Sequence, residues 1–185
     1  MDWKNYNMSR LRFVKEVTLS VAANTVDLPG LFTDEYDTYL VIGENFSHTG
    51  TSNDYVDARL LDASSSAIAT SNYRYGVFYT PSSTGFSTEG GNPGNIIGGI
   101  GFQNAPLAEG VSFEMYVYKP YDASVYTAGH WAGINYKSTG TSQAYSWQGG
   151  FKYTVNERIT GIQLKARNGA NNMDSGTIRC YGVAN

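Results

Sequence analysis

The side chains most often used for metal binding and nucleophilic catalysis are scarce in this sequence. It contains two histidines, His48 and His130, and one cysteine, Cys180. A zinc site takes about three or four such ligands, and neither histidine has a further ligand at metal-binding spacing. A cysteine nucleophile requires a neighbouring base, and nothing in the sequence nominates one. Cys180 shares strand parity with Ile178, so we predict that it is a small core residue. We therefore predict no metal and no cofactor.

Two short acidic clusters, at residues 34–37 and 53–57, are the next candidates for chemistry. Calcium takes about six to eight oxygen ligands, usually along one loop with a glycine turn and a distal glutamate. Neither cluster has that pattern, so we expect both to form surface turns. A carboxylate pair for glycoside hydrolysis stays an alternative, because its members meet only in the folded chain, but the sequence selects no pair. We predict that the protein is not an enzyme.

The glycine-rich stretch at residues 90–101 resembles a phosphate-binding loop only in its glycines. It lacks the terminal Gly-Lys-Ser/Thr, and no amphipathic helix follows it. Phosphate binding depends on that helix N-terminus. We interpret the stretch as a loop that runs into a strand.

Tyrosine is the most informative residue type. The chain has 15 tyrosines. Tyr73, Tyr75 and Tyr79 fall on one face of a predicted strand, and Tyr116 and Tyr118 on one face of another. Most such side chains pack in cores and on sheet faces, but aromatic residues with a polar tip are also enriched at protein interfaces. The pattern favours an interface over a sugar-binding groove.

The segments that position these side chains mostly alternate apolar and polar residues. In residues 111–118 the odd positions are apolar and the even positions are Ser, Glu, Tyr and Tyr. A strand places successive side chains on opposite faces, so this pattern predicts a half-buried strand. Comparable runs are found at residues 12–19, 38–46, 55–61, 72–79, 111–119, 145–154, 160–167 and 176–183.

Turn residues separate these runs. All five prolines are expected between strands, since proline lacks the amide hydrogen that a central strand donates. Eight or more short strands with frequent turns predict an antiparallel all-β sandwich or barrel. We predict one domain over residues 11–185, preceded by an N-terminal arm over residues 1–10 that carries no alternation.

Composition excludes several classes of protein. Charged residues make up 16% of the chain and apolar residues 41%, which is unlike a disordered protein. The net charge is −3, whereas a nucleic-acid-binding protein shows a basic excess. One cysteine forms no internal disulfide. The sequence begins without an apolar signal segment and contains no membrane-spanning run, so we expect synthesis in a cytoplasm and no nucleic-acid or membrane partner.

The C-terminal third carries the most specific motifs. These are Ile159-Thr160-Gly161-Ile162-Gln163-Leu164, then residues 168–171 (Asn-Gly-Ala-Asn), then Ser175-Gly176-Thr177-Ile178-Arg179-Cys180-Tyr181-Gly182-Val183. Residues 35–42, 59–62 and 71–75 add to the pattern. With these motifs the chain resembles a family of small virion proteins from tailed bacteriophages, over most of residues 12–185.

The resemblance implies a two-sheet jelly-roll domain, no enzyme activity and a position on the outer surface of a virion. The absence of heptads and of a collagen-like repeat favours a capsid decoration (cement) protein over a fibre with its own shaft. The expected partners are the major capsid protein and other copies of the chain, with a homotrimer favoured. We assign capsid or subunit contact to Trp3, Lys4, Tyr6, Arg10 and Arg12. The alternatives are a tail fibre or receptor-binding, glycan-contacting module, and a carbohydrate-binding or hydrolysing protein outside a virion.

Overall fold

The computed structural model describes residues 10–48, 54–80, 87–103, 110–137, 143–167 and 172–184. Within these ranges the regular structure consists of strands, with no helix. The strands are β1 (Leu11–Leu19), β2 (Thr25–Leu28), β3 (Thr38–His48), β4 (Asp54–Leu61), β5 (Tyr73–Thr80), β6 (Ser87–Gly94), β7 (Ile97–Gln103), β8 (Val111–Tyr118), β9 (Ala128–Lys137), β10 (Gln143–Tyr153), β11 (Gly161–Ala166) and β12 (Met173–Val183).

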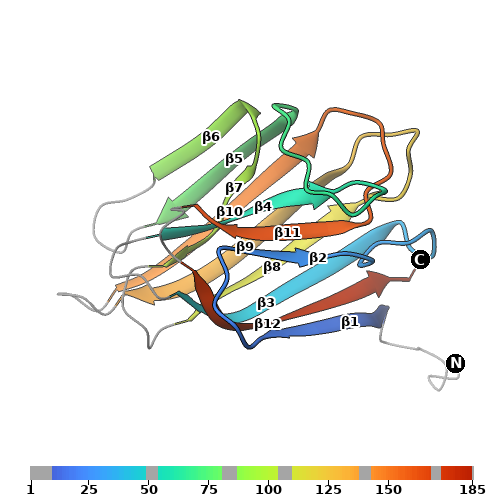
Figure 1. The fold of residues 1–185 in the computed structure, drawn as a ribbon. Helices are drawn as coiled ribbons and strands as arrows, with labels where there is room; N and C mark the ends of the chain where they lie inside the picture. Colours follow the sequence, from blue (N-terminus) through green and yellow to red (C-terminus); the bar gives the residue numbers. More distant parts are fainter. Residues whose placement is uncertain are drawn as a thin grey trace, which may run out of the picture.

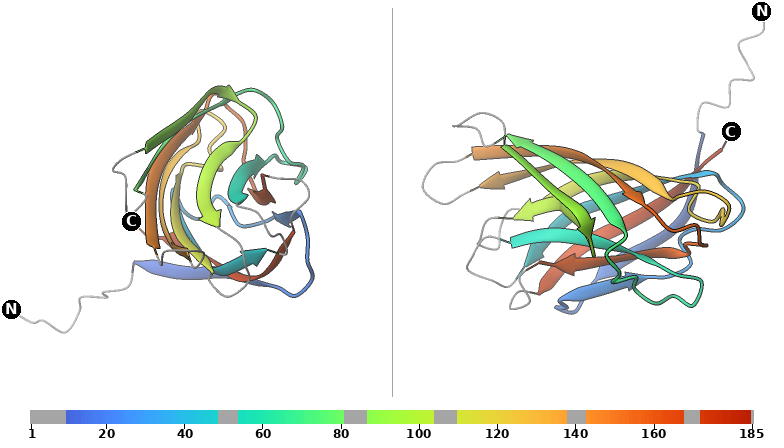
Figure 2. Two further views of the ribbon diagram at one scale, coloured as in Figure 1. Left: turned by 90° about the vertical axis from the view of Figure 1, so that its left-hand side faces the viewer. Right: turned by 90° about the horizontal axis from the view of Figure 1, so that it is seen from above.

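The strands form two antiparallel sheets that pack face to face, which confirms the predicted all-β sandwich. The wide sheet has the order β1-β12-β3-β8-β9-β10-β5-β6, and the narrow sheet has the order β2-β11-β4-β7. The wide sheet curls strongly, and its concave face covers the narrow sheet (Figures 1 and 2). β1 and β6 are therefore the two free edges of the wide sheet.

Successive strands alternate between the sheets, except in the hairpin β5–β6 and in the three-stranded run β8–β9–β10, which stay within the wide sheet. β1, β3, β8 and β12 belong to the wide sheet, whereas β2, β4, β7 and β11 belong to the narrow one. The hairpins β5–β6 and β9–β10 both add to the wide sheet, beyond β8. β7 packs across this added part, in contact with β5, β6, β9 and β10.

The core lies between the sheets and follows the predicted alternation. In β8, the odd-numbered residues Val111, Phe113, Met115 and Val117 are buried, whereas the even-numbered residues are half-buried or exposed. Cys180 is fully buried on the same side of β12 as Ile178, as predicted. Apolar burial of this extent supplies the main driving force for folding.

Two tryptophan side chains hold β7 against the wide sheet. The indole nitrogen of Trp131 in β9 donates to the carbonyl oxygen of Gly99 at 3.1 Å, and that of Trp147 in β10 donates to Ile100 at 2.7 Å. Both rings are buried. Each indole N–H thus has the partner that a buried donor requires.

An ion pair with a buried carboxylate joins β4 to the residue that follows β11 at the same place, and its arginine side chain is 29% exposed. The Arg167 guanidinium donates two hydrogen bonds to the Asp57 carboxylate, from Nε to Oδ2 at 2.9 Å and from Nη2 to Oδ1 at 2.8 Å. The amide of Gly99 also donates to Asp57, at 2.8 Å. The Asp57 side chain is 1% exposed. The prediction that residues 53–57 form a surface turn is therefore wrong for Asp57, since the strand turns this carboxylate inward onto a cation.

Four strands were not predicted from the alternation: β2, β6, β7 and β9. Residues 90–94, expected to be a turn, form the end of β6, and Pro93 lies inside that strand. The prediction that every proline falls between strands is wrong here for a physical reason. β6 is an edge strand, and Pro93 lies where its register with β5 shifts, so the missing amide hydrogen is not needed.

Burial makes the fold sensitive to alkaline pH. It raises the pKa of the Cys180 thiol from 9.0 to about 12, and it also raises the pKa of Tyr73 above the ordinary 10.0. Above pH 9 the unfolded chain loses the thiol proton that the folded chain keeps, so stability is full below pH 9 and falls between pH 9 and 12.

We expect Cys180→Ala to remove the earliest part of this loss. Urea unfolding from pH 8 to 11 should give a plot of unfolding free energy against pH whose slope is smaller in the variant by up to ~1.4 kcal/mol per pH unit. The difference should be clearest just above pH 9, below the ordinary tyrosine pKa of 10.0. An unchanged pH dependence in Cys180→Ala would show that the thiol does not contribute.

Candidate binding face

The convex surface of the wide sheet, turned away from the narrow sheet, is called here the outer face. Cross-strand register arranges its side chains in rows across β8, β9, β10 and β5. The rows are Tyr118, Ala128, Lys152 and Arg74; then Tyr116, His130, Gly150 and Gly76; then Glu114, Ala132, Gln148 and Phe78. Their neighbours along each strand point into the core.

Aromatic and apolar side chains are prominent on the outer face. Phe13, Ile134 and Phe78 are 62%, 56% and 55% exposed. Phe13 lies at the β1 edge, in edge-to-face contact with Tyr181, whereas Phe78 lies near the β6 edge. Because the three residues lie on β1, β9 and β5, they are separate exposed apolar groups and not one contiguous patch.

A stacked cluster of rings occupies the middle of the outer face. The His130 ring stacks on Tyr116, with centroids 5.0 Å apart, and its Nδ1 lies 2.9 Å from the Tyr118 hydroxyl. Desolvation and the neighbouring Tyr116 raise the pKa of Tyr118. The predicted shared face of Tyr116 and Tyr118 is confirmed. Tyr73, by contrast, is buried in the core.

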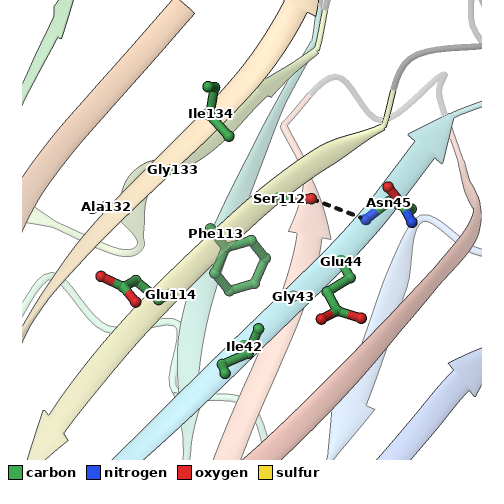
Figure 3. Close-up of a pocket in the computed structure, with 10 residues that line it drawn as sticks. All are labelled: Ile42, Gly43, Glu44, Asn45, Ser112, Phe113, Glu114, Ala132, Gly133 and Ile134. Carbon is green, nitrogen blue, oxygen red and sulfur yellow. Dashed lines mark hydrogen bonds between the residues drawn. The ribbon is translucent and has the colours of Figure 1, made fainter.

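One depression of about 710 Å³ lies over β3, β8 and β9 (Figure 3). Glu44 and Glu114 are both on its lining. Arg179 binds Glu44 and also Glu16, at 2.7 Å, and these two carboxylates raise the pKa of the arginine. Glu44 thus belongs to a surface ion network with Arg179 and Glu16, whereas Glu114 has no ion-pair partner among the described residues.

Two further depressions meet on the added half of the wide sheet. One, of about 480 Å³, is lined by Arg74, Lys152, Gly76 and Gly150 among others. The second, of about 470 Å³, shares Gly76 and Gly150 and is also lined by Phe78, His130, Gln148 and the carboxylate Glu114. We call the two together the β5–β10 groove. These residues come together because β5 pairs with β10 in a particular register. The alternation of residues along one strand does not reveal that register, so the sequence did not identify this groove.

Of the five residues predicted for capsid or subunit contact, the structure describes two, Arg10 and Arg12. Trp3, Lys4 and Tyr6 lie outside the described residues. Arg10 and Arg12 are exposed at the start of β1, an edge strand. The Arg10 carbonyl accepts from the Ala184 amide at 2.7 Å, so the chain enters the sheet beside its C-terminal strand (Figure 1). This edge is opposite to the one nearest the β5–β10 groove.

In the described ranges, no group of three or more histidine, cysteine or acidic side chains is placed to hold a metal ion. Nor do those ranges contain a helix long and apolar enough to cross a membrane. No protein-family model matches the chain, and no curated protein or solved structure is detectably similar to it.

Proposed function

We propose that this chain is a non-enzymatic structural protein of a bacteriophage virion, which binds the outer surface of the capsid as a decoration or cement protein. The observation that carries the proposal is the order of the strands. With the hairpins β5–β6 and β9–β10 set aside, the remaining eight strands have the order 1-8-3-6 in one sheet and 2-7-4-5 in the other. This order supports the proposal of a jelly roll, an architecture frequent in viral capsid proteins.

Two features of the surface support attachment to a protein shell. The exposed Arg10 and Arg12 lie at the β1 edge, next to the segment assigned to contact. The same edge exposes Phe13, an aromatic residue of the kind enriched at protein interfaces. Major capsid protein is the proposed partner, and the chain is proposed to assemble as a homotrimer on the virion surface after synthesis in the host cytoplasm.

Charge reversal at the β1 edge tests the contact. We expect the double variant Arg10→Glu, Arg12→Glu to bind purified capsids at least ~tenfold more weakly, because each reversal replaces an attraction with a repulsion. Deletion of residues 1–10 should weaken binding further. Cosedimentation with capsids measures both effects. Lys165→Glu, on the narrow sheet, is the charge-matched control for each single reversal, Arg10→Glu and Arg12→Glu. Unchanged capsid binding after both changes would contradict the assignment.

A tail fibre or receptor-binding module is the second candidate, and the β5–β10 groove favours it. Copy number distinguishes the two. Quantitative mass spectrometry of purified virions should find the chain in hundreds of copies if it decorates the capsid, and in a handful if it belongs to the tail.

A further inference from the structure

The β5–β10 groove begins at two like charges that face each other directly. Arg74 and Lys152 are cross-strand partners on the outer face, and both are exposed. Neither forms an ion pair with a carboxylate among the described residues. Lys152 is held at the rim by the Tyr126 ring, 4.2 Å from its Nζ to the ring centroid. Like charges directly opposite each other in a sheet repel and destabilise it. An anion bound between Arg74 and Lys152 would relieve this repulsion and accept charge-assisted hydrogen bonds from both side chains.

Beyond the two cations, the floor of the groove is open backbone. Gly76 and Gly150 are cross-strand partners in the next row. A Cβ at Gly76 would meet nothing within 4 Å, and its φ is not in the left-handed region, so neither crowding nor backbone conformation requires glycine there. The glycines leave room for a flat group to lie on the sheet.

The far part of the groove combines an aromatic face with hydrogen-bonding side chains. Phe78 and Gln148 face each other one row beyond the glycines, and His130 and Glu114 border the same depression. The Glu114 carboxylate accepts hydrogen bonds from sugar hydroxyls and lies away from the Arg74 and Lys152 end, where the negative group of the ligand is placed. From Arg74 to Phe78 the groove spans about 13 Å, at roughly 3.3 Å per residue. Sugar rings present apolar C–H faces to aromatic rings and hydroxyls to amide and imidazole groups.

We propose that the β5–β10 groove binds an acidic oligosaccharide, with a uronate carboxylate between Arg74 and Lys152 and a neighbouring sugar on Phe78. The carboxylate suits the bidentate guanidinium. A flat glycine floor suits a sugar ring better than a peptide, whose side chains require pockets at alternate positions. This site goes beyond capsid attachment, and it lies near the sheet edge opposite Arg10 and Arg12.

Calorimetric titration of the full chain with oligogalacturonate tests the proposal. We expect binding that weakens with added salt, and at least ~tenfold weaker binding of neutral galactose oligomers of equal length. Arg74→Ala, Lys152→Ala and Phe78→Ala should each weaken uronate binding by about tenfold, as expected when a charged contact or an aromatic platform is lost. Arg158→Ala and Phe13→Ala, outside the groove, are the charge-matched and ring-matched controls and should bind as the parent does.

Gly76→Val separates a binding role from a structural one. Valine suits a strand, and the space above Gly76 is free, so the melting temperature should not fall. The added methyl groups would fill the floor and reduce uronate binding by about tenfold or more. Unchanged uronate binding by Gly76→Val, equal affinity for polyglutamate or single-stranded DNA, or no uronate binding by the folded parent would each overturn the proposal. Because capsid cosedimentation of the groove variants is measured separately, failure here is distinguishable from failure of the capsid assignment.

Discussion

Replacement of Asp57 by alanine is expected to lower the free energy of unfolding by about 3 kcal/mol, the range in which breaking one side of a buried ion pair falls. Asp57 accepts two bonds from Arg167 and one from the Gly99 amide. Its removal takes a carboxylate partner from the Arg167 guanidinium, whose side chain is 29% exposed, and also takes the acceptor from the Gly99 amide. Arg167 also packs over the Tyr55 ring, 4.1 Å from the centroid, so its position is fixed.

Urea denaturation of matched variants tests this expectation. Asp37→Ala is the control, because Asp37 pairs with Lys119 at 3.8 Å with both side chains at least half exposed. Exposed pairs contribute less than about 1 kcal/mol. A double variant, Asp57→Ala with Arg167→Met, should recover part of the loss, since the guanidinium that Asp57 balances is then replaced by an apolar side chain. Equal effects of Asp57→Ala and Asp37→Ala would contradict the assigned role of Asp57.

Replacement of Trp131 by alanine is expected to cost about 3–5 kcal/mol, as large-to-small changes at buried aromatic residues do. Trp131 is 1% exposed, and its indole is the donor to Gly99. The substitution opens a cavity between the sheets and also leaves the Gly99 carbonyl without this bond. β7 should then pack less firmly on the wide sheet.

Thermal unfolding together with amide exchange in β7 measures this effect. Trp131→Phe should recover most of the packing but not the hydrogen bond, and should lie between the parent and Trp131→Ala. Phe78→Ala, an exposed ring on the same sheet, is the control and should change stability by less than about 0.5 kcal/mol. If amide protection in β7 is the same in Trp131→Ala as in the parent, the indole does not anchor that strand.

Half-buried strands were predictable because the alternation of apolar and polar residues that marks them lies within a short stretch of sequence. β8 alternates cleanly, so its inner and outer faces follow directly from residues 111–118. β9 does not, because Gly129 and Gly133 interrupt the apolar pattern. A Cβ at Gly129 would meet the Phe151 ring, and one at Gly133 would meet the Trp147 ring. These glycines make room for aromatic rings that lie on the next strand, so their meaning depends on register.

The same dependence limits what sequence reveals about the candidate sites. The outward faces of Tyr116 and Tyr118 were predictable from parity alone. Asp57 looked like part of an acidic surface cluster because its partner, Arg167, is 110 residues away in the sequence, directly after β11. Arg74 and Lys152 became a pair only through the register of β5 with β10. The sequence therefore predicts which face of a strand a residue occupies, but it does not predict which residues become partners across two strands.

A cryo-EM reconstruction of the phage virion that carries this protein tests the central proposal most directly. The account predicts repeated density for a two-sheet sandwich on the outer capsid surface, with the β1 edge and Arg10 and Arg12 toward the shell and the β5–β10 groove toward solvent. Density for the sandwich at the tail alone, or no such density on the virion, would contradict it.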